Sequence, residues 1–124
     1  MSTRQLYFAL DLRNDPSLIA EYEAWHRPER IWREIPEFLS AAGILDLEIF
    51  RCGNRLVMVM EVSERFSIAN YGEMARASDR VKAWEEMMWS FQSSVPCAAP
   101  GEKWVPMRRV FSLEETLAAH EPQP

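Results

Sequence analysis

The sequence of 124 residues predicts an α+β fold, in which one antiparallel sheet is covered by helices on a single face. Segments with alternating apolar residues, which is strand periodicity, are interleaved with segments in which apolar residues recur every three or four positions, which is helix periodicity. The resulting order is β-α-β-β-α-β. This order is typical of the ferredoxin-like split βαβ arrangement.

The strands are predicted from alternation and from the turns between them. Residues 5–12 form the first strand, because every second residue is apolar. Residues 45–50 and 56–62 form the next two, and the Gly-Asn pair at 53–54 indicates a tight hairpin between them. Alternation over 105–111 predicts a final strand, and the proline near its start indicates an edge position.

The helices are predicted between these strands. An Asn-Asp-Pro cap begins the first helix, which is expected to run to about His26. Helical spacing continues over 35–42, where Gly43 can end the helix in a left-handed conformation. Two more helical segments are expected, over 67–77 and, after a Ser-Asp cap, over 78–91.

The length and composition predict one domain. A chain of this length with 48% apolar residues can form one core but not two. We expect the domain to span residues 1–115 and the C-terminal tail, 116–124, to be disordered. The uncovered sheet face has apolar residues that could be buried by a second copy or could line a ligand cavity, and a homodimer can do both.

Charge and sequence pattern exclude several classes of partner. The net charge is −5 and the basic residues are scattered, so we expect no nucleic acid and no membrane as partners. The N-terminus lacks a signal-peptide pattern and no apolar stretch approaches a spanning helix, so a cytoplasmic protein is expected. Cys52 and Cys97 lack the paired spacing of metal or redox motifs and are expected to be reduced.

His26 is the candidate for chemistry. It is the one histidine within a predicted element, and it lies four residues after Tyr22, on the same helix face. A histidine titrates near neutrality and can both give and take a proton, which is what opening a cyclic hemiacetal requires. Spacing alone leaves open the alternative of a packing role at the end of the helix.

The segments Tyr22-Glu-Ala-Trp-His26-Arg-Pro28 and Ile31-Trp32-Arg-Glu34-Ile35 resemble the Y-x-x-x-H-x-P and I-W-x-E-[LI] signature of rhamnose mutarotases, with two residues inserted. The similarity continues at residues 59–62, 82–87 and 109–113, so it spans nearly the whole chain. The resemblance implies a ferredoxin-like subunit that forms a homodimeric α/β barrel with facing sheets. It also implies an enzyme that interconverts the α and β anomers of a free monosaccharide without a metal or a cofactor.

The same resemblance implies roles for individual residues. The family's acid/base histidine falls on His26, its substrate-binding tyrosine on Tyr22, and the second of its tandem tryptophans on Trp84. Ala83 stands in place of the first tryptophan, and Leu47 in place of a further substrate-contacting tyrosine. These two departures indicate that the walls of the sugar site have changed.

The segments 84–92 and 99–107 resemble a branch of the family associated with L-fucose. L-Fucose is therefore the expected 6-deoxyhexose, with L-rhamnose as the alternative. Trp89 is a predicted substrate-binding residue, although helix packing explains it equally well, and the same two interpretations apply to Trp104.

Glu61 is the last predicted substrate-binding residue. It lies on a strand built otherwise of Leu, Val and Met, and it falls on the side of Val57 and Val59, opposite Met58 and Met60. A carboxylate there could bind sugar hydroxyls or support the histidine, or it could form a salt bridge to an arginine within or between subunits.

Two alternatives to a mutarotase remain open at this point. A noncatalytic ligand-binding dimer of the same fold would not depend on His26, because this fold supports unrelated functions. A cofactor-free monooxygenase of the related dimeric barrels would need a deep apolar pocket for an aromatic substrate. Exchange between sugar anomers distinguishes all three.

Overall fold

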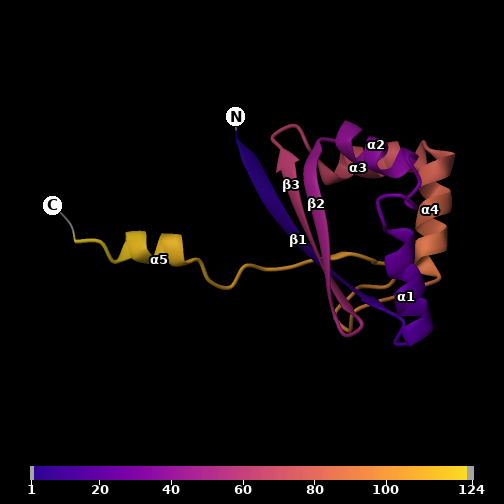
Figure 1. Cartoon of the computed structure of the whole chain (residues 1–124). Helices are drawn as coiled ribbons and strands as arrows, with labels where there is room; N and C mark the ends of the chain where they lie inside the picture. The colour runs from indigo at the N-terminus through magenta and orange to yellow at the C-terminus, as the bar shows by residue number, and fades with distance from the viewer. Residues whose placement is uncertain (1, 123–124) are drawn as a thin grey trace.

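A computed structural model describes residues 2–122 as an antiparallel sheet with helices on one side (Figure 1). Its elements are β1 (Thr3–Leu12), α1 (Pro16–Trp25), α2 (Glu34–Ala41), β2 (Ile44–Cys52), β3 (Arg55–Ser63), α3 (Ile68–Arg76), α4 (Asp79–Trp89), β4 (Gln92–Ser93), β5 (Val105–Pro106) and α5 (Leu113–Ala119). The predicted α+β, ferredoxin-like fold is confirmed.

The sheet has the order β2-β3-β1-β4, and β5 pairs with β1 along the same edge as β4. The long β1–β3 pairing and the β2–β3 hairpin are both antiparallel. Gly53 has a φ of 61° in the turn of this hairpin, so the predicted Gly-Asn turn is confirmed. Helices α1 to α4 lie on one side of the sheet (Figure 1).

The helix starts follow the predicted caps. The Asp15 carboxylate accepts hydrogen bonds from the backbone N–H groups of Ser17 and Leu18, at 2.9 and 3.2 Å. Ser67 and Ser78 are the N-caps of α3 and α4. Gly43 follows α2 with a φ of 96°, and a Cβ at this position would lie 3.0 Å from Ser63 Oγ.

The core lies between the sheet and the helices. Alternate residues of β1 and β3 face the helices, and Leu10, Leu12, Leu56 and Val62 are less than 2% exposed. The residues between them face the opposite side, where Tyr7 on β1 and Phe50 on β2 remain largely exposed. Within residues 2–122, no helix covers this second surface, which we call the open face.

The final strand is shorter than predicted. The pairing with β1 covers only Val105 and Pro106, and the Met107 N–H then donates to the Tyr7 carbonyl at 2.8 Å. Pro106 has no N–H to contribute to the ladder, which favours a short edge strand. Beyond it the chain leaves the sheet. The two-residue β4 was not predicted, because two residues are too few to show alternation.

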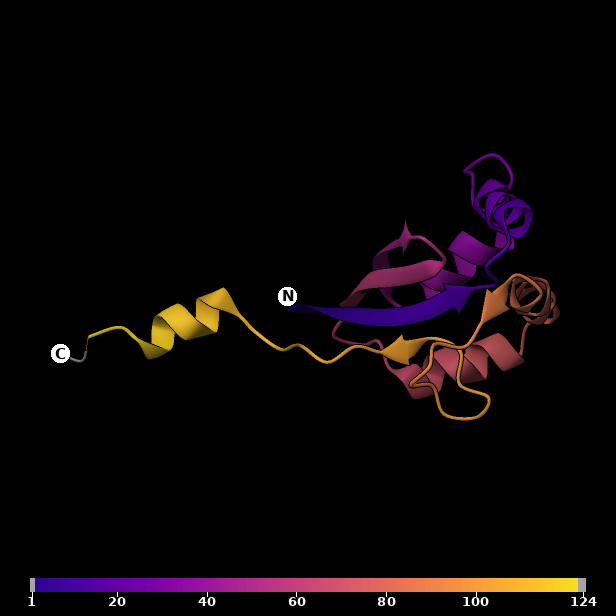
Figure 2. The same ribbon diagram turned by 90° about the horizontal axis from the view of Figure 1, so that it is seen from below.

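Residues 107–122, here called the C-terminal arm, extend away from the sheet (Figures 1 and 2). Helix α5 begins after Ser112, whose side chain accepts the Glu115 N–H. Residues 116–119 are therefore helical where the sequence predicted disorder, and residues 123–124 lie outside the described part of the chain. The extent of the domain, 1–115, stays a prediction. None of the helices in residues 2–122 is long and apolar enough to cross a membrane.

Candidate active site

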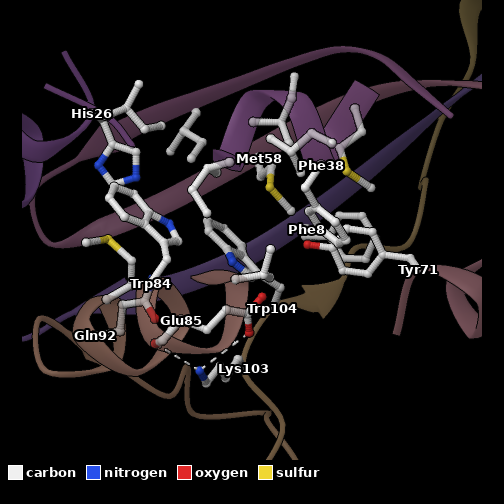
Figure 3. A pocket seen from close by; sticks show the side chains of 18 of the residues that line it. Phe8, His26, Phe38, Met58, Tyr71, Trp84, Glu85, Gln92, Lys103 and Trp104 are labelled. Carbon is white, nitrogen blue, oxygen red and sulfur yellow. Dashed lines mark hydrogen bonds and ion pairs between the residues drawn. The ribbon is translucent and has the colours of Figure 1, made fainter. Parts of the chain in front are cut away.

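A cavity of about 310 Å³ lies between the helices and the covered face of the sheet. Most of its wall is apolar, and Phe8, Leu47, Ile49, Met58 and Met60 form its floor on β1, β2 and β3. Figure 3 shows the polar side chains that reach it from the helices and from the loop before β5. The sequence left open that a ligand cavity lies on the uncovered face of the sheet. The cavity lies instead on the face that the helices cover.

His26 lies in this wall at the C-terminal end of α1. Its Nδ1 lies 2.7 Å from the backbone carbonyl oxygen of Tyr22, one turn earlier. A carbonyl oxygen only accepts hydrogen bonds, so Nδ1 must carry the hydrogen and donate it. In the neutral ring, Nε2 therefore keeps its lone pair and is the nitrogen that can act as a base.

Aromatic rings hold the imidazole in place. The Tyr22 ring centroid lies 4.3 Å from that of His26, and the Trp84 centroid lies 5.5 Å away in an edge-to-face arrangement. Trp32 packs against Trp84 from the other side, at 5.4 Å. The histidine therefore packs against side chains of α1 and α4, and Trp32 of the α1–α2 connection packs behind Trp84.

Burial sets the protonation state of the Tyr22 phenol and of the His26 imidazole. It raises the pKa of Tyr22 to about 12, against a smaller opposing effect of a hydrogen bond with Gln92, so the phenol stays protonated at neutral pH. Burial also lowers the pKa of His26, and the hydrogen bond with the Tyr22 carbonyl partly offsets this. Neutral imidazole is thus the prevailing form of His26 above pH 6.5.

This shift predicts how activity and stability depend on pH. We expect the acidic limb of the kcat/KM profile to fall below pH 6.5, because His26 keeps its lone pair there. Between the lowered pKa and 6.5 the unfolded chain binds more protons than the folded one, so the free energy of unfolding should decrease as the pH falls. Kinetics and urea unfolding between pH 4.5 and 8 test both points, with His26→Gln as the reference.

The structure brings together three of the predicted site residues and separates two. Tyr22, His26 and Trp84 line the cavity. Within residues 2–122, the cavity wall includes neither Glu61 nor Trp89. Glu61 follows the cavity-lining Met60 on β3 and so faces the other side of the sheet, where its registered neighbours are Gln5 and Asp46.

Trp89 lies at the end of α4, beside a shallow surface groove. It comes five residues after Trp84, and this spacing places it on a different side of the helix. The Lys103 ammonium lies 5.0 Å from the centre of its ring, in a cation–π arrangement. Trp89 therefore supports Lys103 from outside the cavity.

Several cavity residues were not among the predicted site. Glu85, Lys103, Tyr71 and Gln92 line the wall, and so does Trp104, whose role the sequence left open. Glu85 shares the inward stripe of α4, since it follows Val81 by four residues and precedes Met88 by three. A carboxylate on an otherwise apolar stripe was the signal that could have identified it.

The departures from the rhamnose mutarotase signature differ in position. Leu47 lies in the cavity wall, whereas Ala83 is exposed on α4. Trp104, from the loop before β5, provides a second indole in the wall besides Trp84. No group of three or more His, Cys, Asp and Glu residues within 2–122 is arranged to hold a metal ion.

Comparisons with known proteins identify relatives over the whole domain. The family model described as L-rhamnose mutarotase matches residues 5–113. The chain is 46% identical over 121 residues to an L-fucose mutarotase of Xanthomonas campestris, which covers 98% of this chain and 97% of that protein.

Solved structures share the fold. The L-rhamnose mutarotase of Formosa agariphila superposes with a TM-score of 0.63 at 22% identity, covering 89% of this chain and 98% of that one. Tetracenomycin F2 cyclase of Streptomyces glaucescens, a polyketide cyclase, gives 0.57 at 12% identity, covering 88% and 97%. At such identities these likenesses concern the fold alone. The family model and the full-length relative show more: the chain belongs to the L-rhamnose mutarotase family.

Proposed function

We propose that the protein is a mutarotase that interconverts the α and β anomers of a free 6-deoxyhexose and prefers L-fucose. The observation that carries the proposal is the fixed tautomer of His26, which leaves Nε2 as a base in the wall of the cavity. The likeness to an L-fucose mutarotase over the full length supports this choice of sugar. The alternative sugar is L-rhamnose, from the family's description.

One ring nitrogen can perform both proton transfers. His26 Nε2 accepts the proton of the anomeric hydroxyl while the bond between C1 and the ring oxygen breaks and the C1 carbonyl forms. The imidazolium then returns the proton to the former ring oxygen, which becomes a hydroxyl. Both oxygens are bonded to C1 in the closed sugar, so they lie within reach of the same nitrogen.

The other anomer forms after rotation. The open-chain aldehyde rotates about the C1–C2 bond, and the hydroxyl then attacks the opposite face of the carbonyl while the two proton transfers run in reverse. Every step moves a proton or a C–O bond within the sugar, so the proposed reaction requires no cofactor. A cavity of about 310 Å³ suits such a ligand, since small-molecule sites begin at roughly 300 Å³.

The apolar wall favours a deoxy sugar. The methyl group of a 6-deoxyhexose and the C–H face of its ring are apolar, and they can pack against Trp84, Met58 and Phe8. Tyr22 can donate its hydroxyl hydrogen to a sugar oxygen, because its raised pKa keeps it protonated. We propose Tyr22 and Trp84 as substrate-binding residues on these grounds.

We expect the enzyme to act on L-fucose with the highest kcat/KM, followed by L-rhamnose. D-Galactose, which has the ring configuration of the mirror image of L-fucose and a polar C6, should react more slowly, because its extra hydroxyl would be buried against apolar side chains. NMR magnetisation transfer between anomers measures all three rates. Acceleration of D-galactose above both deoxy sugars would contradict the proposed substrate class.

We also propose that the protein acts as a homodimer in which the C-terminal arm of each subunit lies on the open face of the other. The arm presents Val110, 95% exposed, with Phe111, Leu113 and Leu117 each more than half exposed. The open face presents Tyr7 and Phe50. A second copy of the chain would bury both apolar surfaces at once.

Charge complementarity supports the same partner. The arm carries Arg108 and Arg109, of which Arg109 already pairs with Glu115 of the same arm, whereas Asp46, Glu48 and Glu61 lie on the open face. In the proposed dimer, Glu61 therefore pairs with Arg108 of the partner's arm instead of a sugar hydroxyl. This is the salt-bridge alternative that the sequence left open for Glu61.

The double substitution Phe111→Ser with Leu117→Ser is expected to shift the protein from dimer to monomer, because it removes two exposed apolar side chains of the arm. Sedimentation velocity at several concentrations measures the change. Glu114→Gln is the control, since it alters an exposed charge on the same helix and should leave the dimer intact. A wild-type protein that sediments as a monomer at every concentration would rule out the dimer.

A further inference from the structure

We infer that the Glu85 carboxylate, held by Lys103, binds the sugar hydroxyls remote from the reacting carbon and so determines which 6-deoxyhexose the enzyme prefers. The inference rests on the proposed mutarotase function and assigns the specificity contact within the same cavity.

Glu85 and Lys103 come from distant parts of the chain and meet in the cavity wall. Glu85 lies on α4 directly after Trp84, and Lys103 lies in the loop that leads into β5. Lys103 Nζ lies 3.9 Å from Glu85 Oε2 and donates to the Glu85 backbone carbonyl at 3.4 Å. Both residues are half-buried and line the cavity (Figure 3).

The position of this pair is unusual for a structural ion pair. The Lys103 and Glu85 side chains are 32% and 43% exposed and their charged atoms lie 3.9 Å apart, and a partly exposed pair of this kind contributes little to stability. The adjacent Glu86 is exposed and lies outside the cavity, so a carboxylate on this helix need not face the cavity. A carboxylate kept in the cavity wall is suited to a polar ligand.

A carboxylate fits sugar hydroxyls well. Its two oxygens accept hydrogen bonds and donate none, so one carboxylate can receive the hydrogens of two neighbouring hydroxyls. Lys103 balances the charge of Glu85, and its second neighbour, the Trp89 ring, holds it in place from outside. Trp104, the residue after Lys103, adds a flat apolar ring beside the carboxylate (Figure 3).

Tyr71 completes the polar group. Its hydroxyl belongs to α3, and Figure 3 shows it directed into the cavity. Burial raises the pKa of Tyr71 to about 12, and the negative charge of Glu85 adds to this shift, so the phenol stays protonated at neutral pH. A neutral phenol that donates and a carboxylate that accepts, both in the wall of one cavity, offer a sugar both kinds of hydrogen-bonding partner.

The arrangement relative to His26 indicates which hydroxyls are bound. Figure 3 shows Glu85 and Lys103 away from His26, with Trp84 between them in this view. With C1 of the sugar at His26, the opposite side of the ring carries the hydroxyls at C3 and C4. L-Fucose and L-rhamnose differ in configuration at C4 and at C2, so a contact with the C3–C4 pair distinguishes them.

Glu85→Gln tests the inference, because it keeps the shape of the side chain and removes its charge. We expect KM for L-fucose to rise about ten- to a hundredfold, as for the loss of hydrogen bonds to a charged group. We expect kcat to change much less, since His26 is untouched. The preference for L-fucose over L-rhamnose should fall by about tenfold or more.

Two further measurements separate recognition from a structural role. The wild-type enzyme should bind 4-deoxy-L-fucose more weakly than L-fucose, because the sugar lacks one hydroxyl that Glu85 binds. The Glu85→Gln variant should bind the two sugars with similar affinity, because it has already lost that contact. Glu85→Asp, which keeps the charge, should retain the preference for L-fucose even if its affinity is reduced. Glu86→Gln is the matched control and should behave as wild type.

The outcomes distinguish this inference from the function on which it rests. If wild type exchanges the anomers and Glu85→Gln keeps the wild-type preference and KM, the role of Glu85 is overturned and the mutarotase proposal stands. Reduced preference in Glu86→Gln as well would also overturn it, because the effect would then reflect the charge of α4. If wild type accelerates no sugar, both proposals are overturned.

Discussion

His26→Ala is expected to remove most of the catalysed anomer exchange. General acid/base assistance typically contributes about 10²–10⁴-fold, and in the proposed mechanism His26 Nε2 performs both proton transfers. Mutarotation also occurs without an enzyme, so the exchange rate should fall toward this background and not to zero. Magnetisation-transfer NMR on L-fucose, at equal concentrations of wild type and variant, measures the loss.

Chemical rescue shows whether His26→Ala is slow because it lacks a proton-transfer group or because its structure is damaged. Free imidazole should restore part of the exchange in His26→Ala, since the substitution vacates space beside Tyr22 and Trp84. His26→Gln should be as slow as His26→Ala, because an amide does not accept a proton near neutral pH. Full activity in His26→Ala would show that another group carries the proton.

Trp84→Ala is expected to lower the free energy of unfolding by about 3–5 kcal/mol, the usual cost of truncating a large buried aromatic residue. Trp84 is 7% exposed and belongs to the main buried cluster, together with Tyr22, Val81 and Met88. The same substitution removes a ring against which His26 packs, so activity should fall as well. Urea unfolding followed by circular dichroism measures the stability.

Trp89→Ala is the matched control on the same helix. Trp89 is only partly buried, and its ring contacts the Lys103 ammonium at the surface. We expect a loss of stability less than half that of Trp84→Ala. Equal losses would show that the inward stripe of α4 does not dominate the packing of this helix.

Local sequence patterns were sufficient to predict most of the fold. Phe8, Leu10 and Leu12 are buried at every second position along β1, and such a period defines a strand whatever lies around it. Asp15 and Ser78 cap their helices by accepting hydrogen bonds from backbone N–H groups two or three residues later, so the caps can be recognised in the sequence itself. The final strand was overestimated, because alternation persists through the arm although pairing stops near Pro106.

The site was predicted only in part. Tyr22 and His26 are one helical turn apart, so their shared face follows from spacing. Glu85 was overlooked because Glu86 follows it directly in the sequence, and two adjacent acidic residues usually face solvent. Lys103 and Trp104 reach the cavity through the path of the loop after β4, and periodicity carries no information about the path of a loop.

Glu61 and Trp89 illustrate the converse. Their residue types suit sugar binding, but strand parity and helix rotation place both outside the cavity wall formed by residues 2–122. Glu61 lies on the open face, where the proposed dimer gives it a basic partner. Positions relative to the sheet, and not residue types alone, therefore decide which side chains can meet a substrate.

The most direct measurement of the central claim is anomer exchange of L-fucose in the presence of the wild-type protein. Magnetisation transferred between the H1 resonances of the α and β forms gives the exchange rate at equilibrium, without a coupled assay. We expect the rate to increase in proportion to protein concentration at pH 7.5. A rate equal to that of buffer at every protein concentration would contradict the assignment of this protein as an L-fucose mutarotase.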